Sequence, residues 1–189
     1  MHFPTSALVV LMQTTALGGE APVALVGNDG VVGVAAFMGT LPEAGRAVVL
    51  HSGHAWRLPT SVLSTEAPGP SQVLKATVGY LMALTSQISQ TAFCQQHHNV
   101  EQRLVRWLLT ALDRMPGNDV AMDLGELATL LGVPADALAG AAAQLVGAGA
   151  LVCEQGRLVM PSRDLLQARS CGCHVPAQGE MRWSSPPPG

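Results

Sequence analysis

One run near the C-terminal end of the chain has the residue types of a metal site. The run Cys171-Gly172-Cys173-His174 supplies two thiols and an imidazole, which are ligand groups that Zn²⁺ prefers in proteins. A tetrahedral site also needs a distant ligand, which a single Cys-x-Cys-His does not provide. A structural or incidental use of these residues is therefore favoured, and the sequence assigns no metal ligand and no cofactor.

Two further groups of polar residues could be drawn as sites. The side chains of His97 and His98 point about 100° apart on a helix and cannot easily hold one metal ion, so helix-end capping or solvent exposure is favoured. Asp29, His51 and Ser52 have the groups of a catalytic triad, but nothing around the serine resembles a nucleophile elbow. The sequence is therefore not expected to encode an enzyme.

The composition predicts a cytoplasmic protein with a sizeable core. The chain has 189 residues, is 48% hydrophobic, and has a mean hydropathy of +0.30 and a formal net charge of −3. Its length suffices for one sizeable domain or two small ones, and its low charge leaves any DNA contact to a local patch. Four cysteines are too few for a disulfide framework, and Cys94 is expected to be a small buried hydrophobe. No apolar run reaches the roughly 18 residues of a membrane span, so no membrane partner is expected.

The stretch 123–160 predicts the most sharply defined set of elements. Leucines at helical spacing predict a helix over 124–131, and Gly132 ends that helix through a left-handed turn. A second helix follows over 135–146, and residues 150–160 form two short strands around the turn Glu154-Gln155-Gly156. Helix, sharp turn, helix and hairpin is the order of a winged helix-turn-helix, whose second helix lies in the DNA major groove.

The N-terminal part of the chain is β-prone. Short runs over 7–12, 21–26, 31–37, 46–51 and 55–58 are bounded by Gly, Pro or Ser, as antiparallel strands are. The turn Gly27-Asn28-Asp29-Gly30 separates two of these runs. The first sixty-odd residues are therefore expected to form part of a β-sandwich or roll.

A long helix is predicted after the linker Ala67-Pro68-Gly69-Pro70. Its apolar stripe alternates spacings of four and three, the pattern of a coiled-coil seam, and comprises Leu74, Val78, Leu81, Thr85, Ile88 and Ala92. Such a stripe usually packs against a second copy of itself, although it could instead cover the β-roll, and dimerisation is favoured. Asn99 then caps a further helix over 100–115.

Four segments carry a family resemblance: HFPTSALVVLM, ALVGNDGVVGVAAFMG, QISQTAFCQQHHNVEQRLVRWLLTALD and LATLLGV. Together with the order of elements they resemble the Crp/Fnr family of bacterial transcription regulators over roughly residues 2–174. The resemblance implies an α+β fold in which a partial cyclic-nucleotide-binding-like β-roll at 1–67 precedes a long dimerisation helix at 70–98. A winged helix-turn-helix domain follows at 99–174, and residues 175–189 are expected to be a disordered tail. A homodimer that binds two-fold symmetric DNA sites is also implied.

The resemblance suggests where a small-molecule effector would bind. Gly33, Val34 and Arg46 stand at or beside the family's ligand-binding positions. Relatives that bind cyclic nucleotides carry a glutamate where Val34 stands and an Arg-Ser pair where Gly45-Arg46 stands, so cyclic AMP is not expected and the effector is unknown. Iron–sulfur relatives use N-terminal cysteines, and no cysteine precedes Cys94, so an oxygen-sensing cluster is not expected. The family's opening strands are also missing, so either the natural start lies upstream or the roll is incomplete.

The predicted recognition helix is poor in groups that read DNA. Family members carry arginines and a glutamate where this chain has PADALAG over 134–140, which leaves Asp136 as a polar candidate for a base contact. Arg157 and Arg163 could hold phosphates, which position a protein without specifying sequence. The predicted DNA-facing residues are Ala135, Asp136, Ala139, Gln144, Arg157 and Arg163.

Three functions are compatible with these features. The favoured one is a homodimeric DNA-binding regulator whose sequence-reading face is largely stripped. The second is an interaction or dominant-negative module that dimerises through the long helix without reading DNA. The third is a small-ligand-binding protein that uses the β-roll, which would show a thermal shift with some metabolite even without DNA binding.

Overall fold

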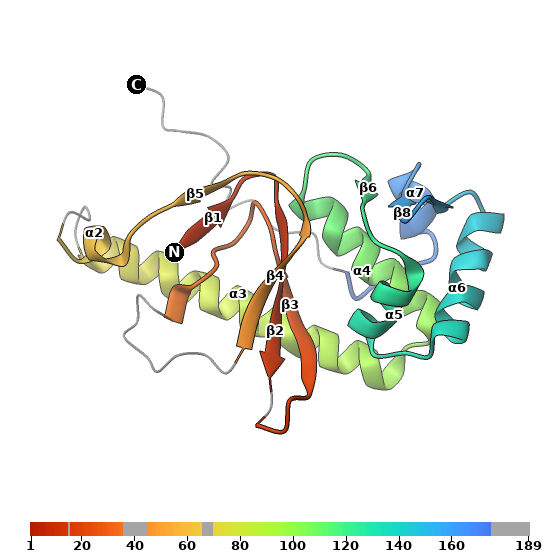
Figure 1. Ribbon diagram of the computed structural model, residues 1–189, viewed down its shortest axis with the longest axis horizontal. Helices are drawn as coiled ribbons and strands as arrows, with labels where there is room; N and C mark the ends of the chain where they lie inside the picture. Colours follow the sequence, from red (N-terminus) through yellow and green to blue (C-terminus); the bar gives the residue numbers. More distant parts are fainter. Residues whose placement is uncertain (15, 36–44, 66–69, 175–189) are drawn as a thin grey trace. The chain divides into compact units, whose positions relative to one another are not determined.

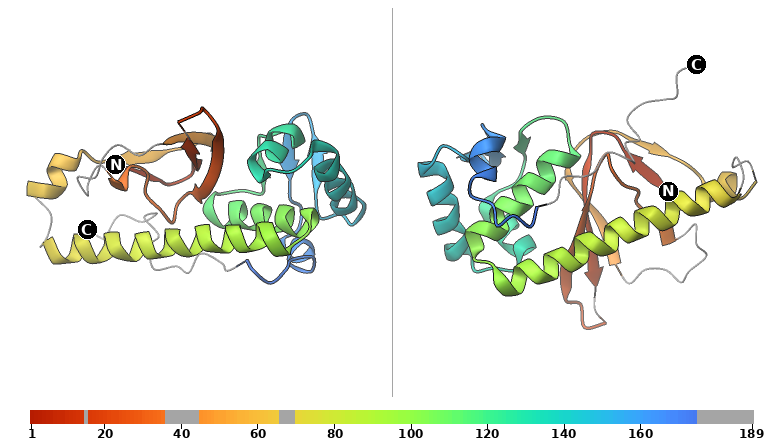
Figure 2. Two further views of the ribbon diagram at one scale, coloured as in Figure 1. Left: turned by 90° about the horizontal axis from the view of Figure 1, so that it is seen from below. Right: turned by 180° about the vertical axis from the view of Figure 1, so that it is seen from behind.

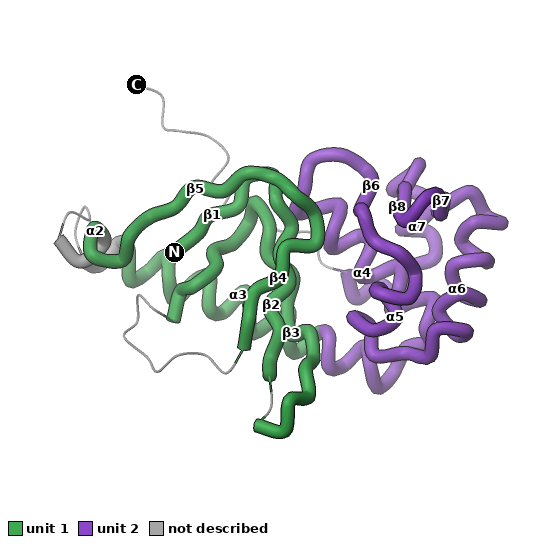
Figure 3. Tube along the Cα trace, in the orientation of Figure 1, with its two compact units in different colours: residues 1–90, 179–189 green, residues 91–178 purple. Residues whose placement is uncertain are grey.

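A computed structural model describes residues 1–14, 16–35, 45–65 and 70–174 of the chain. It divides into two compact units, drawn in different colours in Figure 3. Unit 1 comprises Met1–Gln90 and unit 2 comprises Thr91–Gln178, so the boundary falls inside the long helix. Both helices and strands are present, as predicted for an α+β fold.

Unit 1 is built on an antiparallel sheet whose central strand is β2 (Leu8–Thr14). This strand pairs with β3 (Glu20–Val26) on one side and with β4 (Gly45–His51) on the other, as Figure 1 shows. Val10 stands opposite Leu25 on β3 and opposite Val48 on β4. Aliphatic residues of β2 and β3 are buried, as β-branched and leucine side chains on a half-covered sheet should be. These three strands match the prediction to within two residues at each end.

A second, two-stranded sheet joins β1 (His2–Pro4) to β5 (Ala55–Arg57). The predicted strand over 31–37 is wrong in its described part, because Val32 makes only an isolated bridge to His2. Gly33 has a φ of +86°, which interrupts the extended backbone, and Val34 and Ala35 are already helical. The last two positions of that predicted strand lie outside the described residues.

Two helices complete unit 1: α2 (Thr60–Thr65), which the sequence did not predict, and the first part of α3 (Pro70–His97). Both views in Figure 2 show this part of α3 next to the strands, and in the right-hand view the helix crosses them obliquely. Tyr80 on α3 is buried, and its hydroxyl donates a 2.8 Å hydrogen bond to the carbonyl oxygen of Val31. A Cβ on Gly30 would lie 3.0 Å from the Tyr80 ring, so the predicted turn needs glycine for this close approach.

Unit 2 begins with the end of α3 and continues into α4 (Val100–Arg114). The predicted cap is confirmed: the Asn99 side chain accepts from the backbone N–H of Gln102 at 2.9 Å, and the Gln102 side chain accepts from the backbone N–H of Asn99. Leu104 and Leu108, at helical spacing, are fully buried. Burial of each such leucine contributes roughly 1.5–3 kcal/mol, which holds α4 as the central helix of the unit.

The remaining elements of unit 2 follow the predicted order, with two unpredicted additions, β6 and α7. They are β6 (Asp119–Val120), α5 (Leu124–Leu131), α6 (Ala135–Gly147), β7 (Val152–Glu154), β8 (Arg157–Val159) and α7 (Arg163–Gln167). Helix α6 contacts both α4 and α5, and α7 contacts α4. The hairpin β7–β8 gains β6 as a third strand beside β8.

Within the described ranges, no single helix combines the length and apolar character needed to cross a membrane. Helices α5 and α6 meet that test only when they are taken together, across a bend of 114°.

Candidate functional site

The turn between α5 and α6 has the geometry of a helix-turn-helix. Asp123 caps α5 by accepting a 2.8 Å hydrogen bond from the N–H of Glu126. At the other end, Gly132 is left-handed with φ +60° and ψ +46°, and the N–H of Val133 donates to the carbonyl oxygen of Ala128 at 3.1 Å. The two helices meet at 114°, within the range typical of DNA-binding helix-turn-helix motifs.

Helix α6 buries one face and leaves the other open. The buried side carries Leu138, Ala142 and Leu145. The four residues predicted to face DNA on this helix are all exposed: Ala135, Asp136, Ala139 and Gln144. Only two of these four have a polar side chain and none is cationic, so the exposed surface offers few groups for reading base edges.

The two arginines predicted to hold phosphates take part in ion pairs within the chain. Arg157 begins β8, directly after a two-residue turn in which Gln155 and Gly156 both have positive φ, and pairs with Asp119 on β6. Arg163 at the start of α7 pairs with Asp113 on α4 at 2.6 Å. Both guanidinium groups remain partly exposed, so their role at DNA stays a prediction.

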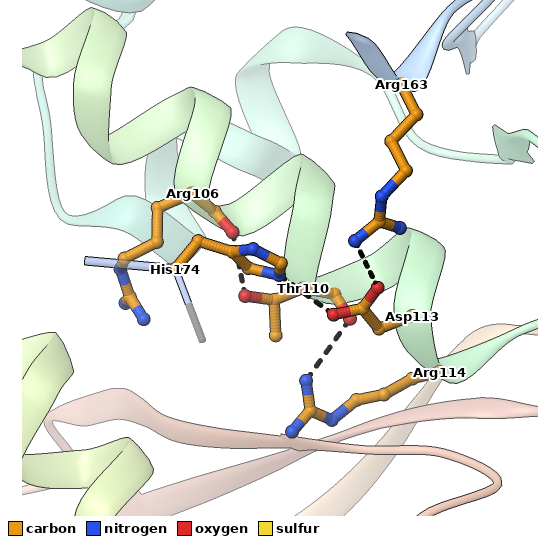
Figure 4. A network of polar contacts seen from close by, with 6 residues as sticks. All are labelled: Arg106, Thr110, Asp113, Arg114, Arg163 and His174. Carbon is orange, nitrogen blue, oxygen red and sulfur yellow. Dashed lines mark hydrogen bonds and ion pairs between the residues drawn. The ribbon is translucent and has the colours of Figure 1, made fainter. Parts of the chain in front are cut away.

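Asp113 is the centre of a polar network at the end of α4, shown in Figure 4. Its carboxylate accepts from Nε2 of His174 at 2.8 Å in addition to the pair with Arg163. Burial alone would raise the pKa of the Asp113 carboxyl, but the hydrogen bonds and charges of His174 and Arg163 outweigh it, so the pKa lies below its ordinary value. The Asp113 and His174 side chains are 9% and 6% exposed. The network therefore fastens the C-terminal segment to α4.

The predicted dimer stripe lies mostly on the surface of α3. Leu74, Val78, Thr85, Ile88 and Ala92 are exposed, and only Leu81 is half-buried, because it packs against the cluster around Tyr80. The stripe is therefore not the face with which α3 covers unit 1. Dimerisation itself stays a prediction.

Four potential metal ligands of unit 2 come together at the end of α3. The ligand atoms of Cys94, His98, Cys171 and Cys173 all lie within 4.8 Å of one another. Cys94 is buried as predicted, but His98 is half-buried rather than exposed, and its Nδ1 is buried with no hydrogen-bond partner. Burial, and then the neighbouring thiols of Cys171 and Cys94, raise the pKa of Cys173 to about 11.

No protein-family model matches the chain, and no curated protein matches it. Several solved structures do match the chain. A CRP-family transcriptional regulator from Thermus thermophilus has a TM-score of 0.71 at 14% identity, covering 92% of this chain and 89% of its own. This chain has the Crp/Fnr fold. A second CRP/FNR-family regulator from that organism has a TM-score of 0.60 at 17% identity over 88% of this chain and 85% of its own. The c-di-GMP-responsive global regulator CLP of Xanthomonas campestris has a TM-score of 0.58 at 18% identity, with coverages of 85% and 84%.

The candidate effector residues of this Crp/Fnr fold are engaged within unit 1. Arg46 on β4 donates two hydrogen bonds of 2.7 Å to the carboxylate of Glu20 on β3. The bond from Arg46 holds the pKa of the Glu20 carboxyl below its ordinary value. Val34 is buried beside Tyr80, and Gly33 precedes it in the left-handed region. Residues 36–44, between these positions, lie outside the described residues, so a ligand site here stays a prediction.

Sequence reasoning missed two members of the four-ligand group. The sequence pattern pairs His98 with His97 and predicts Cys94 as a buried hydrophobe, and neither prediction connects these residues to Cys171 and Cys173. The spacing of Cys94 and His98 by four residues was a usable signal, because such residues share one helix face. Cys171 and Cys173 reach Cys94 and His98 because α7 packs on α4. The local sequence does not predict this packing.

Proposed function

We propose that the protein is a homodimeric DNA-binding transcription regulator that discriminates weakly between sequences. The observation that carries the proposal is the helix-turn-helix formed by α5, the left-handed Gly132 and α6, with the outward side of α6 exposed beside a β-hairpin wing. In this motif the second helix enters the major groove while the first crosses the backbone. The regulators that share the Crp/Fnr fold support the same general kind of function.

Weak discrimination follows from the side chains on α6. A bidentate arginine-to-guanine pair contributes roughly 1–3 kcal/mol of discrimination, and the exposed positions Ala135, Asp136, Ala139 and Gln144 include no arginine. Binding would then depend on phosphate contacts, for which Arg157 and Arg163 are the candidates. Each of them would have to share its guanidinium between DNA and an internal carboxylate, which lowers its contribution.

Dimerisation through α3 would supply the second recognition helix that a two-fold DNA site requires. Leu74, Val78 and Ile88 are large apolar side chains, between 39% and 51% exposed, in line along the helix. A second copy of the same stripe is the natural partner of a seam with this spacing, because each apolar side chain fits between those of the facing helix.

Fluorescence anisotropy with labelled duplexes of unrelated sequence tests DNA binding. We expect measurable binding at low salt, with log K falling linearly as log salt concentration rises, because phosphate contacts release counterions. We also expect unrelated duplexes to differ less than the 10³-fold that marks specific binders. Nanomolar binding to one sequence alone would contradict the proposal of a stripped recognition face.

An Ile88→Asp substitution tests the dimer. Two facing carboxylates in the seam should dissociate the dimer, which sedimentation or light scattering would show as half the mass, and should weaken DNA binding in parallel. Ala83→Asp is the matched control, because Ala83 is an exposed position of α3 about 180° away from the stripe. A wild-type protein that is monomeric at micromolar concentration would contradict the proposed assembly.

A non-DNA-reading interaction module is the alternative function. The same bare surface of α6 favours it, since alanine and glycine positions that do not read bases are suited to packing against another protein chain. In that case the protein would still be dimeric or pair with a relative, but the anisotropy would not change at any salt concentration.

A further inference from the structure

The strongest chemical feature outside the proposed DNA interface is the group of four ligands in unit 2, here called the cysteine cluster: Cys94, His98, Cys171 and Cys173. Two members come from the end of α3 and two from the segment after α7, so the cluster closes a loop of more than seventy residues. Its atoms lie close enough for all four to touch one ion.

Cys94 and His98 are one helical turn apart at the end of α3. The backbone N–H of His98 donates to the carbonyl oxygen of Cys94 at 3.1 Å, so the last turn continues to His98 and both side chains lie on one face. Nδ1 of His98 is buried and has no hydrogen-bond partner, although an imidazole nitrogen in such a position is costly unless something binds it. A cation in the cluster would be that partner.

The C-terminal segment supplies its two ligands around a tight turn. Gly172 has φ +74°, a conformation that L side chains rarely adopt, and its N–H donates to Oγ of Ser170 at 3.2 Å. This turn brings Cys171 and Cys173 to the same point, where their sulfurs lie near that of Cys94. Next to them, the His174–Asp113 bond fixes the backbone that follows the turn.

We propose that the cysteine cluster is a closed tetrahedral site for one thiophilic divalent cation, with Zn²⁺ the best fit. Three cysteines and one histidine are a common ligand set of structural zinc sites. With Zn–S bonds of about 2.3 Å, the sulfurs of such a site stand about 3.8 Å apart, which agrees with a group whose ligand atoms lie within 4.8 Å of each other. Hard cations such as Mg²⁺ and Ca²⁺ prefer oxygen ligands and are disfavoured here.

Binding of one Zn²⁺ changes the protonation and the charge of the site. The three thiols lose their protons to solvent, the imidazole binds in its neutral form, and the loaded site carries a net charge of −1. The guanidinium of Arg103 on α4 lies close enough to Cys94 to interact with it electrostatically, and offsets this charge. A bound cation also removes the repulsion between neighbouring thiolates that would arise if they ionised without it.

The site would stabilise unit 2 by holding the segment after α7 against the end of α3. The wing and α6 lie within the loop that the site closes, so the cation would support the helix-turn-helix without facing DNA. The inference does not depend on DNA binding, and its failure would leave the proposed regulator function intact.

Cobalt substitution of the full-length chain tests the site directly. Protein stripped with a chelator under reducing conditions should bind one Co²⁺ per chain and develop the intense visible bands of tetrahedral cobalt with the ultraviolet charge-transfer band of thiolate ligation. Zn²⁺ should then displace the cobalt. At a hundredfold excess over its Kd, Zn²⁺ should raise the Tm by about 5–10 °C.

Matched variants separate the cluster from the other thiols and imidazoles. Cys171→Ser and His98→Gln should each weaken cobalt binding by at least about 100-fold, because even indirect partners of a metal cost 10–100-fold when removed. Cys153→Ser removes an exposed cysteine on β7, and His97→Gln removes the exposed neighbour of His98. Both control variants should bind cobalt as the wild type does.

Four results would overturn the proposal. They are no tetrahedral thiolate spectrum with wild-type protein, an equal loss of binding in the control variants, iron accompanied by acid-labile sulfide in place of a single ion, and a disulfide within the cluster that persists under the reducing conditions used. The first, third and fourth results concern the wild-type protein, so a variant that fails to fold does not weaken the test.

Discussion

The outward face of α6 and the C-terminal corner of unit 2 belong to the same winged-helix unit but differ in their chemistry. The face is built from alanine, glycine and the exposed Val146, with one carboxylate and one amide. The corner, defined here as the cysteine cluster together with Asp113, Arg163 and His174, gathers thiols, imidazoles and a buried carboxylate that a guanidinium and an imidazole contact. In this chain the thiols, the imidazoles and the buried carboxylate lie in the corner, while the exposed face of α6 has few groups that could read a DNA sequence.

Removing one carboxylate from each region should show the largest difference in stability between the corner and the α6 face. Asp113→Ala should lower the free energy of unfolding by about 2 kcal/mol, because it leaves Arg163 and His174 without their buried acceptor. Asp136→Ala, on exposed α6, should lower it by no more than about 0.5 kcal/mol. Urea unfolding with unchanged m values measures both. Equal effects would remove the distinction between face and corner.

The same carboxylate predicts how acid acts on the protein. The folded-state pKa of Asp113 lies below its ordinary value of 3.8, so its contribution to stability is complete above that pH and is lost as pH falls through the lower folded-state pKa. Wild-type protein should therefore lose more stability than Asp113→Asn between pH 5 and the acid transition, roughly the window in which carboxylates titrate. Parallel curves for the two proteins would contradict this assignment.

Restoring a cation to the bare face should strengthen DNA binding. Ala139→Arg places a guanidinium at an exposed position of α6 and should lower the Kd for duplex DNA about five-fold, which is about 1 kcal/mol. Ala83→Arg adds the same charge at an exposed position of α3, outside the helix-turn-helix and its wing, and should change the Kd less. The same gain from both variants would mean that net charge, and not α6, determines binding.

Filling an empty position on α6 should give the smallest effect. A Cβ on Gly140 would meet no atom within 4 Å, so Gly140→Ala should raise the free energy of unfolding by about 0.5–1 kcal/mol through helix propensity alone. Gly132→Ala should do the opposite, because its φ of +60° is strained for any side chain although the space is equally open. If Gly140→Ala instead destabilises the protein, this glycine has a packing role that the exposed face does not explain.

Local signals accounted for much of the fold. The capping residue Asn99, the left-handed glycine at 132 and the hairpin turn before Arg157 each determine structure within a few residues, and the sequence predicts all three. The strand expected over 31–37 failed because one glycine, Gly33, outweighed a β-prone run.

The candidate sites were harder to predict, because they depend on contacts between distant segments. The sequence predicts that Arg163 holds a DNA phosphate. In the structure, α7 packs on α4, and Arg163 therefore pairs with Asp113. In the same way, Cys171 and Cys173 lacked a fourth ligand in the sequence, and the packing of the C-terminal segment beside α3 supplied Cys94 and His98. Spacing along the chain can suggest such partners only when they share one helix.

DNA binding as a function of salt tests the proposed function most directly. The wild-type chain is titrated with two unrelated duplexes by anisotropy over a range of salt concentrations. We predict binding to both duplexes with similar Kd values and a linear decrease of log K with log salt, as phosphate contacts require. Complete absence of binding at low salt would contradict the regulator proposal and favour the interaction module.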